Sequence, residues 1–315
     1  MLPIMSDENL VWHYTTVEGL IGMFTRHELW ASSVSFMNDP QEDRYAMDVM
    51  DKAFELLPRS LGTSARSRHD DLRSRDQWRG YSDRFVACAC RDGDLLEMWR
   101  SYGPDSVEGT FAVGLEASAP LGLFVPDNKE RDGAGVPTAS PWTPVVYATS
   151  EESAADAAEQ LRLRFEAVRG DSSDPEDPQV REWFIADDVL DELAGTRKHI
   201  SYRAEQELRV TVTAERAPIR LRSSRFGPVP YLALTGGVGT WGERVQTPGQ
   251  LPIRKIVTWP GAPSQARKGV IAALDEGGHF HDESEYGYER SWAACQAFGG
   301  SLPSVTVRKS RVPFC

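Results

Sequence analysis

The sequence predicts an α+β fold, with a mixed, mostly antiparallel central sheet and helices packed around it. Short apolar strand patterns are numerous, and stretches with helical spacing interrupt them in the first half of the chain. From His199 onward, alternating apolar and polar residues dominate, which favours strands. The length fits a single elaborated domain over 1–315, with long loops expected near 58–80, 117–144 and 222–250.

The beginning of the chain has the pattern β-α-β-α. Residues 10–15 are apolar and aromatic, as in a strand, and residues 17–24 have apolar side chains at helical spacing, with Thr16 as the expected N-cap. A second strand is expected over 29–37. A proline then opens a helix over 40–57.

The later elements follow from the same two periodicities and from turn residues between them. The segment 58–79 is rich in Arg, Ser and Asp, so an exposed loop or a solvated helix is expected there. The C-terminal sequence SVTVRKSRVPF alternates and is expected to close a sheet edge. Further strands are predicted at 85–90, 110–115, 145–148, 219–221, 231–234 and 253–258, and further helices at 95–102, 152–168, 180–193 and 262–274.

Charge and cysteine content exclude several classes of protein. The formal net charge is −12, which disfavours non-specific binding of nucleic acid or anionic lipid. The four cysteines contain no Cys-x-x-Cys pair, so neither a disulfide scaffold nor a cysteine zinc site is expected. No stretch approaches about 18 uninterrupted apolar residues, and the first residues are acidic rather than basic, so we expect a cytoplasmic protein with no membrane segment.

Two groups of polar residues stand where strands are predicted to end or turn. His13 lies in the first strand, where it is either a ligand contact or a half-buried histidine bonded to a neighbouring carbonyl. Asn38 and Asp39 lie at a strand-to-helix junction with Glu42 and Asp43, where such side chains form an Asx-turn and helix cap or a ligand site.

A pair of carboxylates and a pair of aromatic residues complete the candidates. Glu205 and Glu207 are two residues apart, so in a strand both side chains point to one face. Two carboxylates on one face repel each other, so they are expected to be solvated or to pair with Arg203 or Arg209. The alternative is a functional pair that recognises a hydroxyl group or stabilises a cation. Trp99 and Tyr102 share one face of a short predicted helix, as core residues or as a platform for a ring. His279 and His281 lie in a Gly/Asp/Glu-rich stretch that favours an exposed loop over a metal site.

Taken in order, these motifs resemble a widespread bacterial domain family of unknown function. Its members begin with a His-Tyr-Thr strand and a Gly-Leu helix, as in HYTTVEGLIGMF, and continue with a Leu-Trp strand into Phe-x-Asn-Asp-Pro-x-Glu, as in LWASSVSFMNDPQED. A Leu-x-Met-Trp-x-x-Tyr helix matches LLEMWRSYG, and Tyr-x-x-Glu-x-Glu-x-Arg matches YRAEQELR. The ordered set spans nearly the whole chain.

The order of polar residues in this set is similar to that of ADP-ribosyltransferases. That resemblance implies a split central sheet and NAD as substrate, with no metal. It implies that His13 hydrogen-bonds the nicotinamide ribose, and that Glu207, or else Glu205, stabilises the positive ribose as nicotinamide leaves. Tyr102, or else Tyr14, stacks on the nicotinamide ring. The remaining contacts that the resemblance implies for the cofactor site are Thr15, Trp30, Asn38, Asp39 and Trp99.

The resulting expectation is an NAD-consuming enzyme that cleaves the nicotinamide N-glycosidic bond and modifies a macromolecule in defence or competition. The acidic chain favours a protein or small-molecule acceptor over nucleic acid. One alternative is a metal-dependent hydrolase that uses His13, Asp39, Glu42, Glu205 and Glu207. The other is a non-catalytic binding or regulatory module in which the same residues are structural.

Overall fold

A computed structural model describes residues 7–36, 40–74, 84–102, 109–126, 138–170, 177–213, 219–224, 227–278 and 305–312. The helices are α1 Val17–Thr25, α2 Pro40–Leu56, α3 Thr63–Ser74, α4 Leu96–Tyr102, α5 Ser150–Gly170, α6 Pro178–Thr196 and α7 Ser264–Glu276, with 3-10 helices η1 Asp7–Asn9, η2 Val34–Phe36 and η3 Ile200–Glu205. The strands are β1 Leu10–Thr16, β2 Leu29–Ser33, β3 Arg84–Cys90, β4 Thr110–Glu116, β5 Gly122–Phe124, β6 Thr138–Ala139, β7 Thr143–Pro144, β8 Val146–Ala148, β9 Arg197–His199, β10 Glu207–Thr213, β11 Arg220–Ser224, β12 Gly227–Thr235, β13 Arg244–Val245, β14 Ile253–Thr258 and β15 Thr306–Lys309.

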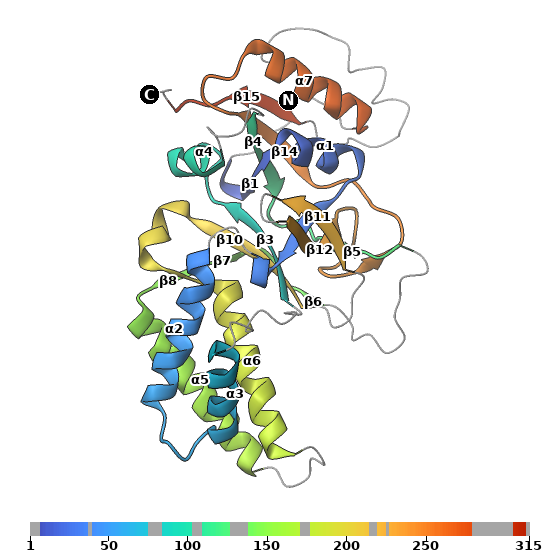
Figure 1. Ribbon diagram of the computed structural model, residues 1–315. Coiled ribbons are helices and arrows are strands. Elements are labelled where there is room, and N and C mark those ends of the chain that lie inside the picture. Colours follow the sequence, from blue (N-terminus) through green and yellow to red (C-terminus); the bar gives the residue numbers. More distant parts are fainter. Residues whose placement is uncertain are drawn as a thin grey trace.

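A single large sheet organises the described part of the chain. Its main path runs β13-β5-β12-β2-β3-β1-β4-β14-β15; β10 also pairs with β3, and β11 with β12 (Figure 1). The pairs β13 with β5 and β14 with β15 are parallel, and the other pairs in this sheet are antiparallel. The predicted α+β class with a mixed, mostly antiparallel sheet is therefore confirmed.

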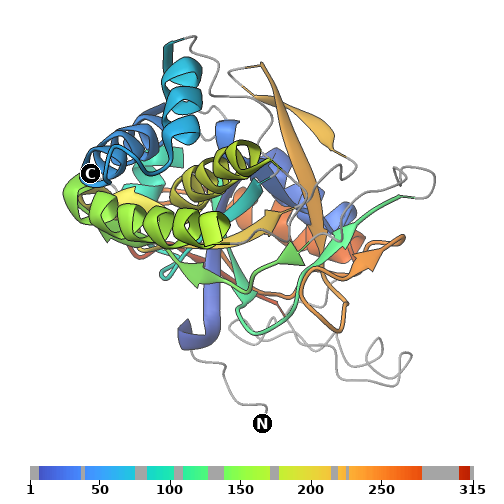
Figure 2. The same cartoon turned by 90° about the horizontal axis from the view of Figure 1, so that it is seen from below.

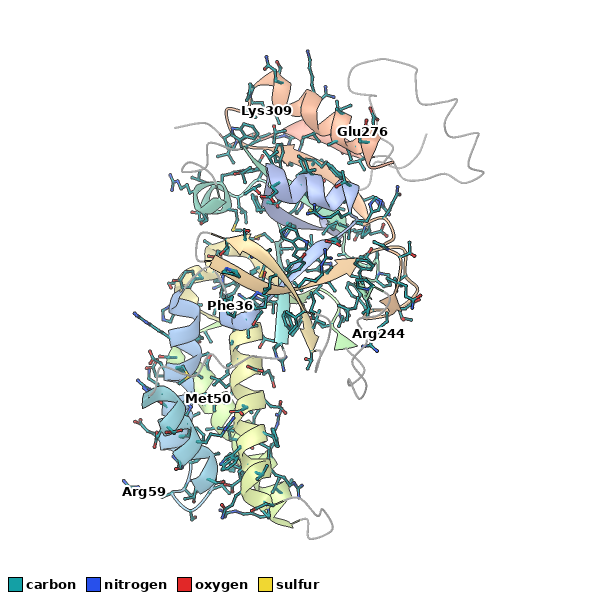
Figure 3. The ribbon with its side chains drawn as sticks, turned by 45° about the vertical axis from the view of Figure 1, so that its right-hand side comes forward. Phe36, Met50, Arg59, Arg244, Glu276 and Lys309 are labelled. Atoms are coloured by element: carbon teal, nitrogen blue, oxygen red, sulfur yellow. The ribbon has the colours of Figure 1, made fainter. Side chains whose placement is uncertain are left out.

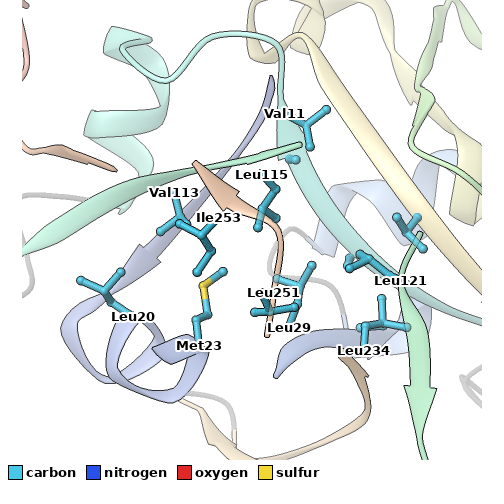
Figure 4. Packing of buried hydrophobic residues seen from close by; sticks show 14 of the residues in the cluster. Val11, Leu20, Met23, Leu29, Val113, Leu115, Leu121, Leu234, Leu251 and Ile253 are labelled. Carbon is cyan, nitrogen blue, oxygen red and sulfur yellow. The ribbon is translucent and has the colours of Figure 1, made fainter. Parts of the chain in front are cut away.

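One face of the sheet carries the main hydrophobic core, and we call it the α1 face. Leu20 and Met23 of α1 lie there with Val113 and Leu115 of β4 and with Leu234 of β12 (Figure 4). Helix α7 covers the same core. Helix α1 begins where the Thr16 side chain accepts a hydrogen bond from the Gly19 amide, so the predicted N-cap is confirmed.

The opposite face, which we call the α6 face, is covered by two separate helical groups. Helices α2, α3, α5 and α6 pack on one another and extend away from the sheet (Figures 1 and 2). Their buried residues form a second core with Met50 inside it (Figure 3), and this core reaches the sheet at Val86 of β3. The short helix α4 covers the other end of the α6 face, where Trp12 and Trp99 are buried.

The sheet is split along one edge of β3. Strand β10 pairs with β3 over its whole length on the other edge, from Glu207 opposite Cys90 to Thr213 opposite Arg84. On the split edge, β1 pairs only where Trp12 is opposite Cys90, and β2 pairs only at Val86 and Phe85. Strands β1 and β2 therefore diverge beside residues 87–89, and α1 joins them.

Most element predictions are confirmed, and the exceptions have local causes. The strand predicted over 29–37 ends at Ser33, because the chain tightens into η2. The segment near 58–80, for which an exposed loop or a helix was expected, contains the helix α3. Short strands β5, β6 and β7 lie within the expected loop at 117–144, and β11, β12 and β13 within that at 222–250. Strand β15 lies at the sheet edge, as predicted. The single domain over 1–315 stays a prediction.

Truncation of Leu115 tests the main core. Its side chain is 0% exposed, so Leu115→Ala leaves a cavity and should lower the free energy of unfolding by about 2–5 kcal/mol. The matched control is Leu221→Ala, since Leu221 is 64% exposed and its truncation should change stability by less than about 0.5 kcal/mol. Urea unfolding followed by circular dichroism measures both. Equal losses in the two variants would contradict this assignment of the core.

Candidate functional site

The imidazole of His13 lies at the split of the sheet. Its Nδ1 atom is 2.8 Å from the carbonyl oxygen of Cys88, on the edge of β3 that neither β1 nor β2 covers at this point. His13 and Cys88 are both half-buried, whereas the neighbours Ala87 and Ala89 are fully buried. The divergence of the two strands therefore leaves solvent access beside these two residues.

The hydrogen bond to Cys88 fixes the proton of His13. A carbonyl oxygen only accepts, so Nδ1 carries the hydrogen. Burial lowers the pKa of His13, the bond to Cys88 opposes this, and the charge of Arg222 lowers the pKa further. The imidazole is therefore neutral near pH 7, and Nε2 is a hydrogen-bond acceptor that has no bonded partner among the described residues.

Glu207 is the centre of a buried network of charges on the α6 face. Its Oε1 accepts from Arg209 Nε at 2.7 Å, and its Oε2 lies 2.8 Å from Lys198 Nζ and 3.2 Å from Arg209 Nη2. The backbone amide of Glu207 donates to the Tyr147 hydroxyl at 2.8 Å. Arg209 also donates to the carbonyl oxygens of Ala194 and Gly195 at the end of α6. The network thus joins β10 to β9 and to α6.

The two cations keep Glu207 ionised. Burial raises the pKa of this carboxyl, but the charges of Arg209 and Lys198 outweigh burial and bring the pKa to about 2. The thiol of Cys88 also donates to Glu207, and burial raises the pKa of this thiol well above its ordinary value. Glu207 is therefore a carboxylate at neutral pH whose two oxygens already have cationic partners.

The prediction that Glu205 and Glu207 share one strand face is wrong in its geometry. Glu205 ends the 3-10 helix η3, and Gln206 has a left-handed backbone with φ 48°, so β10 begins only at Glu207. The two carboxylates are nevertheless brought together, because Lys198 Nζ lies 2.6 Å from Glu205 and 2.8 Å from Glu207. Of the two arginines proposed as partners from the sequence, Arg209 is the one that pairs with Glu207.

His13 and Glu207 belong to opposite faces of the sheet but share one neighbour. Trp12, Cys90 and Glu207 are directly opposite one another across β1, β3 and β10, so their side chains project to the α6 face. His13 follows Trp12 and projects to the other side. Cys88 connects the two residues, because its carbonyl binds His13 and its thiol binds Glu207.

The aromatic residues Tyr14 and Trp99 are core residues beside this site. Their rings pack edge to face with centroids 4.9 Å apart, and the two residues are 3% and 4% exposed. The Tyr14 hydroxyl donates to the Asp92 carbonyl and accepts from the Leu95 amide, while Trp99 Nε1 donates to Asp94. Both rings therefore have little surface left for stacking on a ligand.

The other residues proposed for the cofactor site divide into two sets. Thr15 and Trp30 are half-buried; Thr15 is two residues after His13 on β1, and Trp30 lies on β2, across the split. Asn38 and Asp39, the other two contacts implied for the cofactor site, lie outside the described residues. So does the side chain of Tyr102, although its backbone ends α4.

The residues proposed for a metal do not form a cluster among those that the structure describes. No group of three or more His, Cys, Asp and Glu in the described ranges is arranged to hold a metal ion. His279, His281 and Asp39 lie outside these ranges, as does the side chain of Glu42. Glu205 and Glu207 are engaged by Lys198.

Sequence reasoning missed two cationic residues, Lys198 and Arg222. Lys198 lies in a short strand, β9, which was not predicted. Arg222, whose charge lowers the pKa of His13, lies in β11; the strand predicted there over 219–221 ended before Arg222, and no role was assigned to it. The alternation of arginine and other residues in RLRSS was the available signal, because it places Arg220 and Arg222 on one face.

Comparisons of the chain with protein-family models, with curated proteins and with solved structures find no match. The resemblance to the bacterial family and to ADP-ribosyltransferases therefore stays a prediction. Among the residues that the structure describes, no helix has the length and apolarity that crossing a membrane requires.

Removing the charge of Glu207 should destabilise the fold at neutral pH. Glu207→Gln leaves the positive charges of Arg209 and Lys198 buried without the negative charge of Glu207 beside them. We therefore expect the free energy of unfolding to fall by about 3–5 kcal/mol. Glu205→Gln is the matched control, because Glu205 is more exposed and should cost less than about 1 kcal/mol. Urea unfolding at pH 7 measures both.

The same variant should lose part of the acid dependence of stability. The pKa of Glu207 is about 2 in the folded protein, below its ordinary value of 4.5. Its stabilisation is therefore complete above pH 4.5 and disappears as the pH falls towards 2. Glu207→Gln should show a shallower loss of stability over this interval than the parent, and parallel curves for the two proteins would contradict the ion network.

Proposed function

We propose that this protein is an ADP-ribosyltransferase-like enzyme that binds NAD at the split of the sheet and cleaves the bond between nicotinamide and ribose. The observation that carries the proposal is the neutral His13 at the split. Its Nδ1–H is held by the Cys88 carbonyl, and its Nε2 is left as an acceptor where β1 and β2 diverge.

A histidine held in this way suits a ribose. A ribose hydroxyl is a donor as well as an acceptor, and the unprotonated Nε2 accepts its hydrogen. Because Nδ1 is tied to the backbone, the ring has one orientation and little rotational freedom to lose when a ligand binds. Thr15, two residues further along the same strand, adds a side-chain hydroxyl as a second hydrogen-bonding partner for the ribose.

The proposed reaction breaks one bond and forms one. The C1′–N bond of NAD breaks with its electron pair on the nicotinamide nitrogen, and positive charge develops on the ribose. A hydroxyl or amine of an acceptor, or water, then bonds to C1′ and loses its proton. We assign the stabilisation of this charge to Glu207, because it is ionised and contacts Cys88, the residue that also binds His13; Glu207 itself projects to the opposite face of the sheet.

A second candidate function is a binding module without catalysis, and the contacts of Glu207 favour it. Both oxygens of this carboxylate are engaged by Arg209 and Lys198, so Glu207 stabilises the fold whether or not a reaction takes place. In this case, NAD or a related nucleotide binds at His13 and no nicotinamide is released. The two functions therefore differ in one product that can be measured.

Loss of the His13 side chain should weaken NAD binding. His13→Ala removes the acceptor for the ribose, and one lost hydrogen bond of about 1.5 kcal/mol corresponds to about tenfold in Kd. Isothermal titration with NAD measures this, with circular dichroism to check folding. His199→Asn is the control, because His199 is an exposed histidine in β9 and asparagine retains its capping of the Ser201 amide. Equal affinities of His13→Ala and the parent for NAD would contradict the proposed site.

Nicotinamide release separates the enzyme from the binding module. Parent protein with NAD should release nicotinamide, and Glu207→Gln and Glu207→Asp should lower the rate by about a hundredfold or more while they retain NAD binding. Chromatography of the reaction mixture measures the product, at a temperature at which both variants are folded. Binding of NAD with no release by the parent would establish the binding module instead.

A further inference from the structure

The end of the sheet at β15 carries a concentration of positive charge. Strands β14 and β15, helix α7 and residues 310–312 form this end, and Lys309 lies there beside α7 (Figure 3). We call β15 with residues 310–312 the C-terminal edge. The formal net charge of the whole chain is −12, so this end differs in sign from the molecule as a whole. The basic residues of these segments are Arg254, Lys255, Arg267, Lys268, Arg308, Lys309 and Arg311, and the acidic residues are Asp275 and Glu276.

The cations of this end divide into paired and unpaired ones. Lys268, Lys309 and Arg311 are exposed and have no carboxylate partner among the residues that the structure describes. Lys309 and Arg311 are two residues apart on the C-terminal edge, so uncompensated positive charge collects there. Other cations of this end pair with carboxylates: Arg254 with Glu116, Lys255 with Asp7, and Arg308 with Asp94.

The backbone of β15 adds hydrogen-bond donors to this charge. In a strand, the amide and carbonyl of one residue point to one edge, and those of the next residue point to the other. The Ser310 amide donates to a carbonyl oxygen of β14 at 3.0 Å, so Val307 and Lys309 point away from β14. The Val307 carbonyl accepts from Arg267 Nε at 3.4 Å. The Lys309 carbonyl accepts from Arg308 Nη1 at 3.3 Å. Arginines therefore occupy the outward acceptors of β15.

Asp94 holds the C-terminal edge in position. Its carboxylate accepts hydrogen bonds from the Arg308 guanidinium at 3.0 Å, from the Arg311 amide at 2.7 Å and from the Ser310 hydroxyl. Val312 packs against the core beside α4. Because the backbone of the edge is already ordered, it loses little conformational freedom when a partner binds.

We propose that the C-terminal edge binds an acidic segment of a partner protein. Carboxylates only accept hydrogen bonds, so they match the amide and ammonium of Lys309 and the guanidinium of Arg311, which are all donors. A neutral strand is a poorer partner, because it needs acceptors along the edge as well as donors. Arg267 and Arg308 already occupy the two outward carbonyls that would supply those acceptors.

The charge of the rest of the molecule favours a short acidic segment over a long polyanion. Charges are screened over about 8 Å at physiological ionic strength, so a short segment interacts mainly with the edge itself. Nucleic acid or an anionic bilayer extends further and also meets the acidic remainder of the chain. The inference does not depend on NAD, because β4 and β14 separate β15 from β1 in the sheet.

The test is a titration of the full-length protein with a hexaglutamate peptide, followed by NMR of the backbone amides. The Lys309 amide should shift as the peptide is added, whereas a hexaglutamine peptide should leave it unchanged. Lys309→Gln combined with Arg311→Gln should weaken hexaglutamate binding by about tenfold, because two exposed charge contacts are lost. Both side chains are exposed, and Arg311 contacts Asp94 through its amide, so the variant retains the anchor of the edge.

Lys52→Gln is the matched control, because Lys52 lies on α2 in the helical group and pairs there with Glu151. Its affinity for hexaglutamate should equal that of the parent. An unshifted Lys309 amide, equal binding of hexaglutamine, or unchanged affinity in the double variant would overturn the inference. Tighter binding of double-stranded DNA or of phosphatidylserine vesicles at the same amide would also overturn it, because the partner would then be a phosphate polyanion.

Discussion

The hydrogen bonds along the two edges of β3 hold the sheet together and decide where it opens. Strand β10 satisfies one edge of β3 completely, while β1 and β2 share the other edge and each covers only one end of it. The Cys88 carbonyl between them would be left without a strand partner, and an unpaired buried carbonyl is costly. The Nδ1–H of His13 supplies the missing hydrogen bond. One side chain therefore completes the sheet and is placed at its opening.

The buried charges on the α6 face have a different structural role. Lys198, Glu207 and Arg209 join β9, β10 and the last turn of α6, so they connect the helical group to the sheet. A buried ion pair contributes little net stability compared with apolar residues, but removal of one partner is costly. The requirement for charge balance therefore constrains Glu207 strongly, and any catalytic use of this carboxylate has to preserve its contacts with two cations.

The two sides of the split carry different side chains. On the β1 side, His13 and Thr15 are uncharged hydrogen-bonding groups that project to the α1 face; on the β2 side, Trp30 and Arg222 are an aromatic ring and a cation that project to the α6 face. Helix α1 connects these sides through nine residues, so their spacing is set by a short rigid element packed into the main core.

Local patterns in the sequence determined most of the fold. Apolar periodicity located α5, α6 and β14, and the Thr16 cap and Pro40 located the starts of α1 and α2, because each signal depends on a few adjacent residues. The composition also determined the acidic net charge. The sequence pointed to His13 and Glu207 as polar residues in strands. Their relation depends on the register between β1, β3 and β10, which pairs residues about 80 to 130 positions apart.

Only the tertiary structure decided the geometry of the candidate site. It placed His13 and Glu207 on opposite faces, assigned Lys198 and Arg209 to the carboxylates, and gathered Arg26 and Arg222 around Trp30. The physical reason is that helical and strand periodicity act over a few residues, whereas ion pairs and cation–π contacts join side chains that strand pairing brings together from distant parts of the chain.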